Sequence, residues 1–232
     1  MPDAQLGLNF VINGLGAAAA LGLAASGLVD TTKMFWGGVS NLGFKHIRDA
    51  LNPYAAALSA AIGKDWAETL RAHWINGVPK DDQKAKAKAL IRLGLSPKNA
   101  AAVAEGARVD VARFTTAIQK IQTGAEQELD KADLEVFGRF DTTIEAAIDA
   151  ALERADQQYR NAAKTIAAGV AISLAVVAGG ALFEGTIGDY IGSDSFGLAL
   201  VVGAISVPIA PIAKDLASSL QSAVKALKSV GG

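Results

Sequence analysis

Three long stretches of the chain contain no charged residue, and each has about the length of a membrane-spanning helix. They run from Leu6 to Val29, from Thr165 to Phe183 and from Ser195 to Ala213, and contain 24, 19 and 19 residues. A bilayer core takes about 20 residues of helix to cross. One Lys at mid-membrane costs roughly 3 kcal/mol, so the missing charges are a stronger signal than the many Ala and Gly residues. The pattern predicts three transmembrane helices.

A soluble helical bundle with three buried central helices is the alternative, because buried core helices are also apolar on every side. We favour the membrane interpretation, since three such stretches exceed what a domain of 232 residues usually buries. The first stretch gives the weakest signal, because it contains Asn9, Asn13 and a run of Ala. The flank before it, Met1-Pro2-Asp3, is acidic, which is untypical of a cleaved secretory signal. We therefore expect this stretch to be an N-out membrane helix.

The charged residues are divided among the remaining segments in a way that predicts the topology. Nineteen of the 22 Lys and Arg residues lie between Lys33 and Lys164, and the other three follow the last uncharged stretch. The segment from Glu184 to Asp194 contains acids and no base. Because short basic segments stay on the cytoplasmic side, we expect residues 30–164 and the C-terminal tail inside and residues 184–194 outside. This topology is that of a multi-pass protein of a bacterial-type inner (cytoplasmic) membrane.

These features predict an all-α chain with four parts. Residues 1–30 form an N-terminal transmembrane helix, and residues 31–164 form a helical cytoplasmic domain that ends in a long amphipathic helix. Residues 165–213 form a transmembrane hairpin, and residues 214–232 form an amphipathic cytoplasmic tail that lies on the membrane surface or packs on the domain.

The segment between the first two uncharged stretches lacks strand alternation and hairpin turn signals, so it is expected to be entirely helical. The expected helices cover residues 31–51, 53–76, 80–93, 97–106, 110–122 and 124–183. Thr123 and Glu126 form a capping-box pattern that would start the last of them. In that helix apolar residues recur at an average spacing of about 3.7 from Val136 to Ile166, close to the period of a straight helix. We infer one helix that continues from the domain into the second span.

Small residues recur at helical spacing within the first two stretches, which suits close approach of helix backbones. They are Ala18, Gly22 and Ser26 in the first stretch, and Ala171, Ala175 and Gly179 in the second. Packing within one chain and self-association explain these faces equally well. Pro208 and Pro211 interrupt the third stretch, and proline kinks a helix. We favour a structural bend near the membrane exit over a gate.

Composition and motifs argue against catalysis. The chain has no Cys, which excludes disulfides and thiolate metal sites, and its two His residues, His46 and His73, are too few for a His-based metal site. A Gly-rich phosphate loop, an HExxH pair and a nucleophile elbow are all missing. The uncharged stretches carry no ionisable residue for a proton relay. We therefore predict no catalytic residue, no metal and no cofactor.

Two polar features are interpreted as structural. Ser96 to Gln122 has the outline of a helix-turn-helix, but its second helix offers only Arg113 and Lys120 as bases. Proteins that place a helix in a DNA groove normally carry more Lys and Arg residues on that surface. With a formal net charge of −1, we expect no nucleic-acid partner. The acidic residues from Glu126 to Asp133 are interpreted as a solvated face.

The leading hypothesis is a non-enzymatic membrane protein that acts as a structural or scaffold subunit, as a homo-oligomer or docked on other subunits of a membrane complex. Its expected partners are the lipid bilayer and those subunits. The alternative is a pore-forming or channel-like oligomer. A hydrophobic hairpin at residues 165–213 follows a series of amphipathic helices, and this layout resembles that of α-helical pore-forming proteins such as the pore-forming colicins. The resemblance covers the last third of the chain and is one of architecture, with no shared sequence motif.

Overall fold

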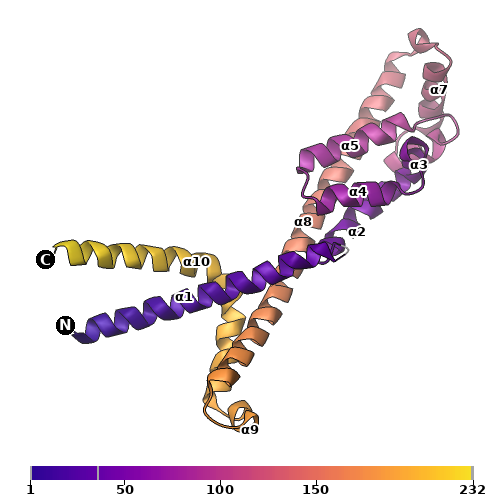
Figure 1. The fold of residues 1–232 in the computed structure, drawn as a ribbon. Helices are drawn as coiled ribbons and strands as arrows, with labels where there is room; N and C mark the ends of the chain where they lie inside the picture. Colours follow the sequence, from indigo (N-terminus) through magenta and orange to yellow (C-terminus); the bar gives the residue numbers. More distant parts are fainter. Residues whose placement is uncertain (1, 36, 231–232) are drawn as a thin grey trace. The chain divides into compact units, whose positions relative to one another are not determined.

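The computed structural model is all-helical, with 84% of the chain in helices and no strand among the residues it describes (Figure 1). These are residues 2–35 and 37–230, with side chains for 13–35, 37–126, 128–212, Asp215 and Ser219. The chain divides into two compact units. The first, which we call the apolar unit, comprises Met1–Trp36 and Arg160–Gly232, and the second, the helical domain, comprises Gly37–Tyr159.

The helical domain contains six whole helices and the first part of a seventh, and the apolar unit contains the rest. The domain helices are α2 (Ser40–Leu51), α3 (Ala55–Ile62), α4 (Trp66–Ile75), α5 (Lys80–Leu93), α6 (Ala100–Ala107), α7 (Val111–Gln122) and the beginning of α8 (Lys131–Leu182). The apolar unit consists of α1 (Pro2–Thr31), the end of α8, α9 (Ile187–Ile191) and α10 (Asp194–Val230). Short 3-10 turns cover Thr32–Met34, Asn52–Tyr54 and Glu126–Glu128. The prediction that one helix continues from the domain into the second uncharged stretch agrees with α8.

The core of the helical domain is built around one stripe of α8. Val136, Phe140, Ile144, Ile148 and Leu152 are buried at spacings of four residues, the period at which side chains share a helix face. The Phe140 ring lies against Phe114 of α7, with ring centroids 4.6 Å apart, a separation at which aromatic pairs attract. The sequence pattern revealed the first part of this stripe, Val136, Phe140 and Ile144, but it did not include Ile148 and Leu152.

Three expected helices have different bounds in the structure. The helix expected at 31–51 begins only at Ser40, after Gly37 and Gly38, which both have a positive φ. The helix expected at 53–76 is split into α3 and α4, because Gly63 adopts φ +93°, a left-handed conformation that ends a helix and favours glycine. The expected capping box at Thr123 is wrong, since the Thr123 hydroxyl donates to the Gln119 carbonyl of the preceding helix. The long helix begins instead after Asp130. The Asp130 carboxylate accepts from the Asp133 N–H at 2.7 Å, and the Asp133 carboxylate accepts from the Asp130 N–H at 3.3 Å.

Salt bridges join α5 to α8 along the helical domain. Lys80 pairs with Glu153 and Asp156, Lys84 with Glu145 and Asp149, Lys88 with Glu145, and Arg92 with Asp141. The bases advance along α5 while their partners recede along α8, so the two helices are antiparallel here. The hydrogen bond from Lys88 holds the pKa of Glu145 below its usual range. Most of these groups are partly exposed, so each pair adds little to the free energy of unfolding. Their main effect is to set the position of α5 along α8.

Asp133 contradicts the interpretation of residues 126–133 as a solvated face. It is only 3% exposed, and its carboxylate accepts a hydrogen bond of 2.9 Å from Lys120 and lies 3.5 Å from Arg113. The hydrogen bond from Lys120 is the main reason that the pKa of Asp133 is lowered. A charged carboxylate away from water needs such partners, so this corner ties α7 to the start of α8.

The paired Asp133 predicts acid sensitivity of the helical domain. A carboxyl whose pKa is lowered by folding stabilises the folded state above its unfolded pKa, near 3.8, and this contribution is lost as the pH falls through the lowered folded value. Asp133→Asn should therefore be less stable than the parent at pH 7, with the difference shrinking below about pH 3.8. Urea unfolding from pH 7 to pH 3 measures this.

Glu105→Gln is the control for this prediction, because Glu105 is exposed and forms no ion pair among the described residues. It should follow the parent at every pH. If the free energies of unfolding of Asp133→Asn and the parent differed by the same amount across the acidic range, the acid sensitivity could not be assigned to Asp133.

Candidate membrane interface

The apolar unit contains three helical segments long and apolar enough to cross a membrane. They are Asn13–Met34, a window within α8 and Asp194–Ile212, and only 28%, 11% and 22% of the residues in their windows are buried. Large side chains on these segments are open to the surroundings, including Val177 at 70% exposure and Leu198 at 64%. A soluble protein rarely leaves so continuous an apolar surface uncovered.

The end of α8 and the first part of α10 pack backbone against backbone. A Cβ placed on Gly203 would lie 2.5 Å from the Ile172 Cα and 3.0 Å from the Ala171 carbonyl oxygen. Ala171 is fully buried, and Ala175 is 9% exposed. Close contact between small residues is the main way in which helices associate when lipid removes the hydrophobic driving force.

The first helix packs on α10 in the same manner. A Cβ on Gly22 would lie 2.3 Å from the Ser206 carbonyl oxygen and 2.7 Å from the Ala210 Cβ. Ala18 is buried, and the Ser26 hydroxyl donates to the Gly22 carbonyl at 2.8 Å. The structure thus brings Gly22 of the predicted small-residue face against α10.

The turn between α8 and α10 is organised by Tyr190, a residue that the sequence reasoning missed. Its ring is buried between Phe183 and Phe196, with ring centroids 5.5 Å away in each case, and its hydroxyl donates to the Val176 carbonyl at 3.0 Å. A Cβ on Gly179 would lie 2.4 Å from the Tyr190 hydroxyl oxygen, so the absence of a side chain there makes room for the ring.

The helix that carries Tyr190 begins with a reciprocal capping box between Thr186 and Asp189. The Thr-x-x-Asp pattern was visible in the sequence and could have revealed this turn. The result is a hairpin whose ends are joined by packing, hydrogen bonds and aromatic contacts.

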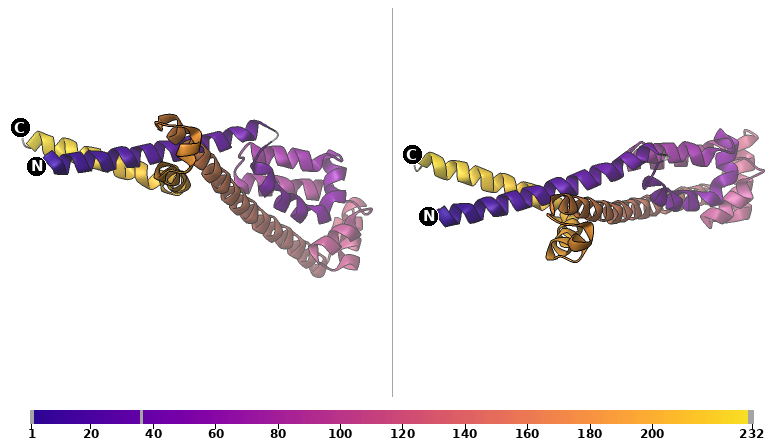
Figure 2. Two further views of the ribbon diagram at one scale, coloured as in Figure 1. Left: turned by 90° about the horizontal axis from the view of Figure 1, so that it is seen from below. Right: turned by 60° about the horizontal axis from the view of Figure 1, so that its bottom comes forward.

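Pro208 and Pro211 both lie inside α10, and this helix is bent in Figure 1 and in both views of Figure 2. Proline removes a hydrogen bond and is the usual cause of a sharp bend within a helix. The backbone of α10 continues as helix to Val230. The apolar face expected on residues 214–232 lies outside the side chains that the structure describes, so the tail's amphipathic character stays a prediction.

The remaining polar candidates are engaged in structural contacts. Arg113 and Lys120, the only bases of α7, are both paired with Asp133, which leaves little free charge on that helix for a nucleic acid. Within the part of the chain that the structure describes, no group of His, Asp and Glu is placed to hold a metal ion.

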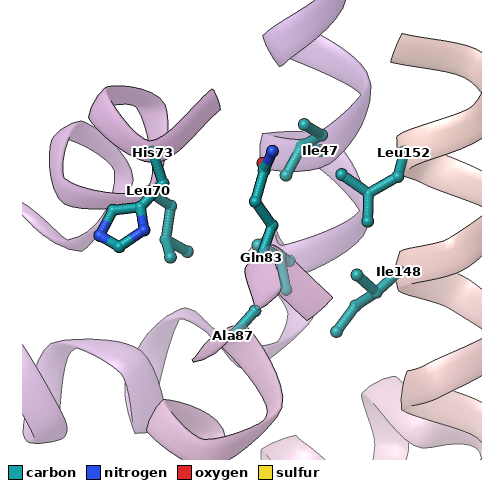
Figure 3. A pocket seen from close by; sticks show the side chains of 8 residues that line it. Ile47, Leu70, His73, Gln83, Ala87, Ile148 and Leu152 are labelled. Carbon is teal, nitrogen blue, oxygen red and sulfur yellow. The ribbon is translucent and has the colours of Figure 1, made fainter. Parts of the chain in front are cut away.

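His73 lines a small cavity between α2, α4, α5 and α8, shown in Figure 3. The other labelled side chains around it are Ile47, Leu70, Gln83, Ala87, Ile148 and Leu152. Its volume of about 10 Å³ is near the lower limit for a single water molecule. The Gln83 amide donates to the Val78 carbonyl at 2.6 Å. This cavity is therefore a packing void in the domain core.

No protein-family model, no curated protein and no solved structure matches this chain. The case for a function rests on the geometry of the chain itself.

Proposed function

We propose that this chain is a non-enzymatic, multi-pass protein of a bacterial-type inner membrane that acts as a structural or scaffold subunit. The observation that carries the proposal is the uncovered apolar surface of three charge-poor helical segments in one unit. Lipid is the solvent in which such a surface is stable, and closely packed small residues then hold the helices together.

The charge distribution supports an orientation with the helical domain in the cytoplasm. All nineteen bases between Lys33 and Lys164 lie between the first and second spans, and the turn between α8 and α10 has none. Bases close to the ends of a span are retained on the cytoplasmic side, and six of these nineteen lie within about 20 residues of the first or second span. This charge pattern would place the N-terminus and the Tyr190 turn outside.

A shallow groove along the exposed side of α8, formed by residues of that helix alone, supports association with a second helix. It offers about 550 Å³ of space and is lined by Ile166, Gly169, Val170, Ser173, Leu174 and Val177. A Cβ on Gly169 would meet nothing within 4 Å, and the Ser173 hydroxyl is bonded to the Gly169 carbonyl at 3.0 Å, so it is satisfied within its own helix. A small residue at each of these positions lets another backbone come close. We propose a second copy of this chain as the partner.

Gly169→Leu tests self-association without disturbing the fold, because its side chain enters open space. Filling the groove should weaken association by about 1–3 kcal/mol, the usual cost of overpacking a contact. The fraction of dimer or higher oligomer in mild detergent, measured by light scattering on a size-exclusion column, is the readout. Gly27→Leu on α1, where a Cβ also meets nothing within 4 Å, is the matched control and should associate like the parent.

A monodisperse monomer for the parent, with no membrane partner in a native pull-down, would remove the support for a scaffold role. The Tyr190-linked hairpin favours a preformed anchor over a pore that opens by separating α8 from α10. Ion leakage from liposomes that contain the protein would instead favour the pore-forming alternative.

A further inference from the structure

A groove on the helical domain collects two arginines. It lies between the turn after α6, which supplies Arg108, and one face of α8, which supplies Glu135, Gly138, Arg139 and Thr143. It offers about 480 Å³ of space and is open to solvent, since Arg108, Gly138 and Arg139 are all exposed. All of these residues belong to the helical domain, so the groove is complete within one unit.

Unlike most arginines of the domain, these two form no ion pair with an acid among the residues that the structure describes. Of the seven arginines in Gly37–Tyr159, Arg48, Arg71, Arg92 and Arg113 form ion pairs. Of the three arginines without an ion pair among the described residues, two line this groove. The groove's one carboxylate, Glu135, lies 4.0 Å from the Lys131 ammonium and is partly neutralised by it. The groove therefore has a net positive charge.

Arg108 has a left-handed backbone conformation, which is unusual for a residue with a side chain. It is the only described non-glycine residue with a positive φ, at 56°, and it occupies the position after α6 where glycine is usual. A left-handed conformation is strained for a residue that has a side chain. Such departures from local preference concentrate at functional positions.

The side of the groove formed by α8 is open because of Gly138. A Cβ at this position would meet nothing within 4 Å, so any larger side chain would extend into the groove without disturbing the fold. The Thr142 hydroxyl, which also lines the groove, donates to the Gly138 carbonyl at 2.9 Å, whereas the Thr143 hydroxyl has no hydrogen-bond partner among the described residues.

We propose that this groove binds a phosphate monoester or pyrophosphate group. Guanidinium groups match phosphate oxygens with paired hydrogen bonds, and the net positive charge of the groove attracts an anion of this kind. The ligand's source is either a soluble phosphate compound or the headgroup of a lipid. This binding is independent of the scaffold role and adds a ligand to the helical domain.

The test uses the full-length chain in phosphatidylcholine nanodiscs and measures pyrophosphate binding by calorimetry at low ionic strength. Saturable binding is expected for the parent. Arg139→Ala should weaken it about tenfold or more, because hydrogen bonds to charged groups are among the strongest. Gly138→Leu should weaken it as much by filling the groove while every charge is retained. Arg154→Ala is the control, since Arg154 is an exposed arginine of the same helix outside the groove, and it should bind like the parent.

Two further discs, with phosphatidic acid or with phosphatidylglycerol at equal surface charge, separate the sources. Equal pyrophosphate affinity in both discs supports a soluble ligand. A lower pyrophosphate affinity in the phosphatidic acid disc alone supports a lipid headgroup, because that headgroup would then compete for the groove. Absence of saturable binding, parent-like binding by both groove variants, or an equal loss in Arg154→Ala would overturn the proposal.

Discussion

Gly203→Val is expected to separate α10 from α8 and to destabilise the apolar unit by about 3 kcal/mol, the upper part of the usual range for overpacking. The new Cβ would lie 2.5 Å from the Ile172 Cα and 2.9 Å from its backbone nitrogen. Backbone atoms of a helix have no rotamer by which to move aside, so the whole contact must open. Titration with a denaturing detergent, followed by circular dichroism, measures the change in the free energy of unfolding.

Gly197→Val is the matched control, because Gly197 lies on the same helix and a Cβ there meets nothing within 4 Å. Both variants replace glycine by the same β-branched residue, so differences in helix propensity cancel. If both variants lost the same free energy of unfolding, Gly203 would not be a point of close helix contact.

Val177→Lys is expected to disfavour membrane insertion of the second span by about 3 kcal/mol, or roughly a hundredfold in the insertion equilibrium. Val177 is 70% exposed in the apolar unit, so the new charge would face lipid and not another part of the described chain. In water the same position would accept a Lys at little cost, because exposed substitutions usually change stability by less than about 0.5 kcal/mol. The size of the effect therefore distinguishes a lipid surround from an aqueous one.

The fraction of chain inserted into microsomes or membrane vesicles during synthesis is the measurement for Val177→Lys. Leu93→Lys in the helical domain, at a position 72% exposed, is the control and should leave insertion unchanged. Parent-like insertion of Val177→Lys would place that side of α8 in water or against protein.

The elements that follow from a single helix's own pattern were predictable. The expected helix at 80–93 coincides with α5, and the buried stripe from Val136 onwards identified α8. Periodicity and absence of charge are properties of one segment, so they can be read without knowing what the segment packs against.

Contacts between helices could not be predicted in the same way. The every-fourth-residue bases of α5 and acids of α8 were visible in the sequence, but which helix faces which depends on the packing of the whole domain. The same applies to Gly203, whose importance comes from Ile172 on another helix. Asp133 was misjudged because a cluster of four acids from Glu126 to Asp133 suggests exposure, whereas its burial depends on Lys120 and Arg113 of α7.

Sedimentation of membranes from lysed cells tests the central claim, that lipid surrounds the three apolar segments, most directly. After an alkaline carbonate wash the full-length chain should remain in the pellet and enter the supernatant only when detergent is added. Recovery of the chain in the supernatant without detergent would contradict the account, and a water-soluble bundle would then have to cover the apolar surfaces of α1, α8 and α10.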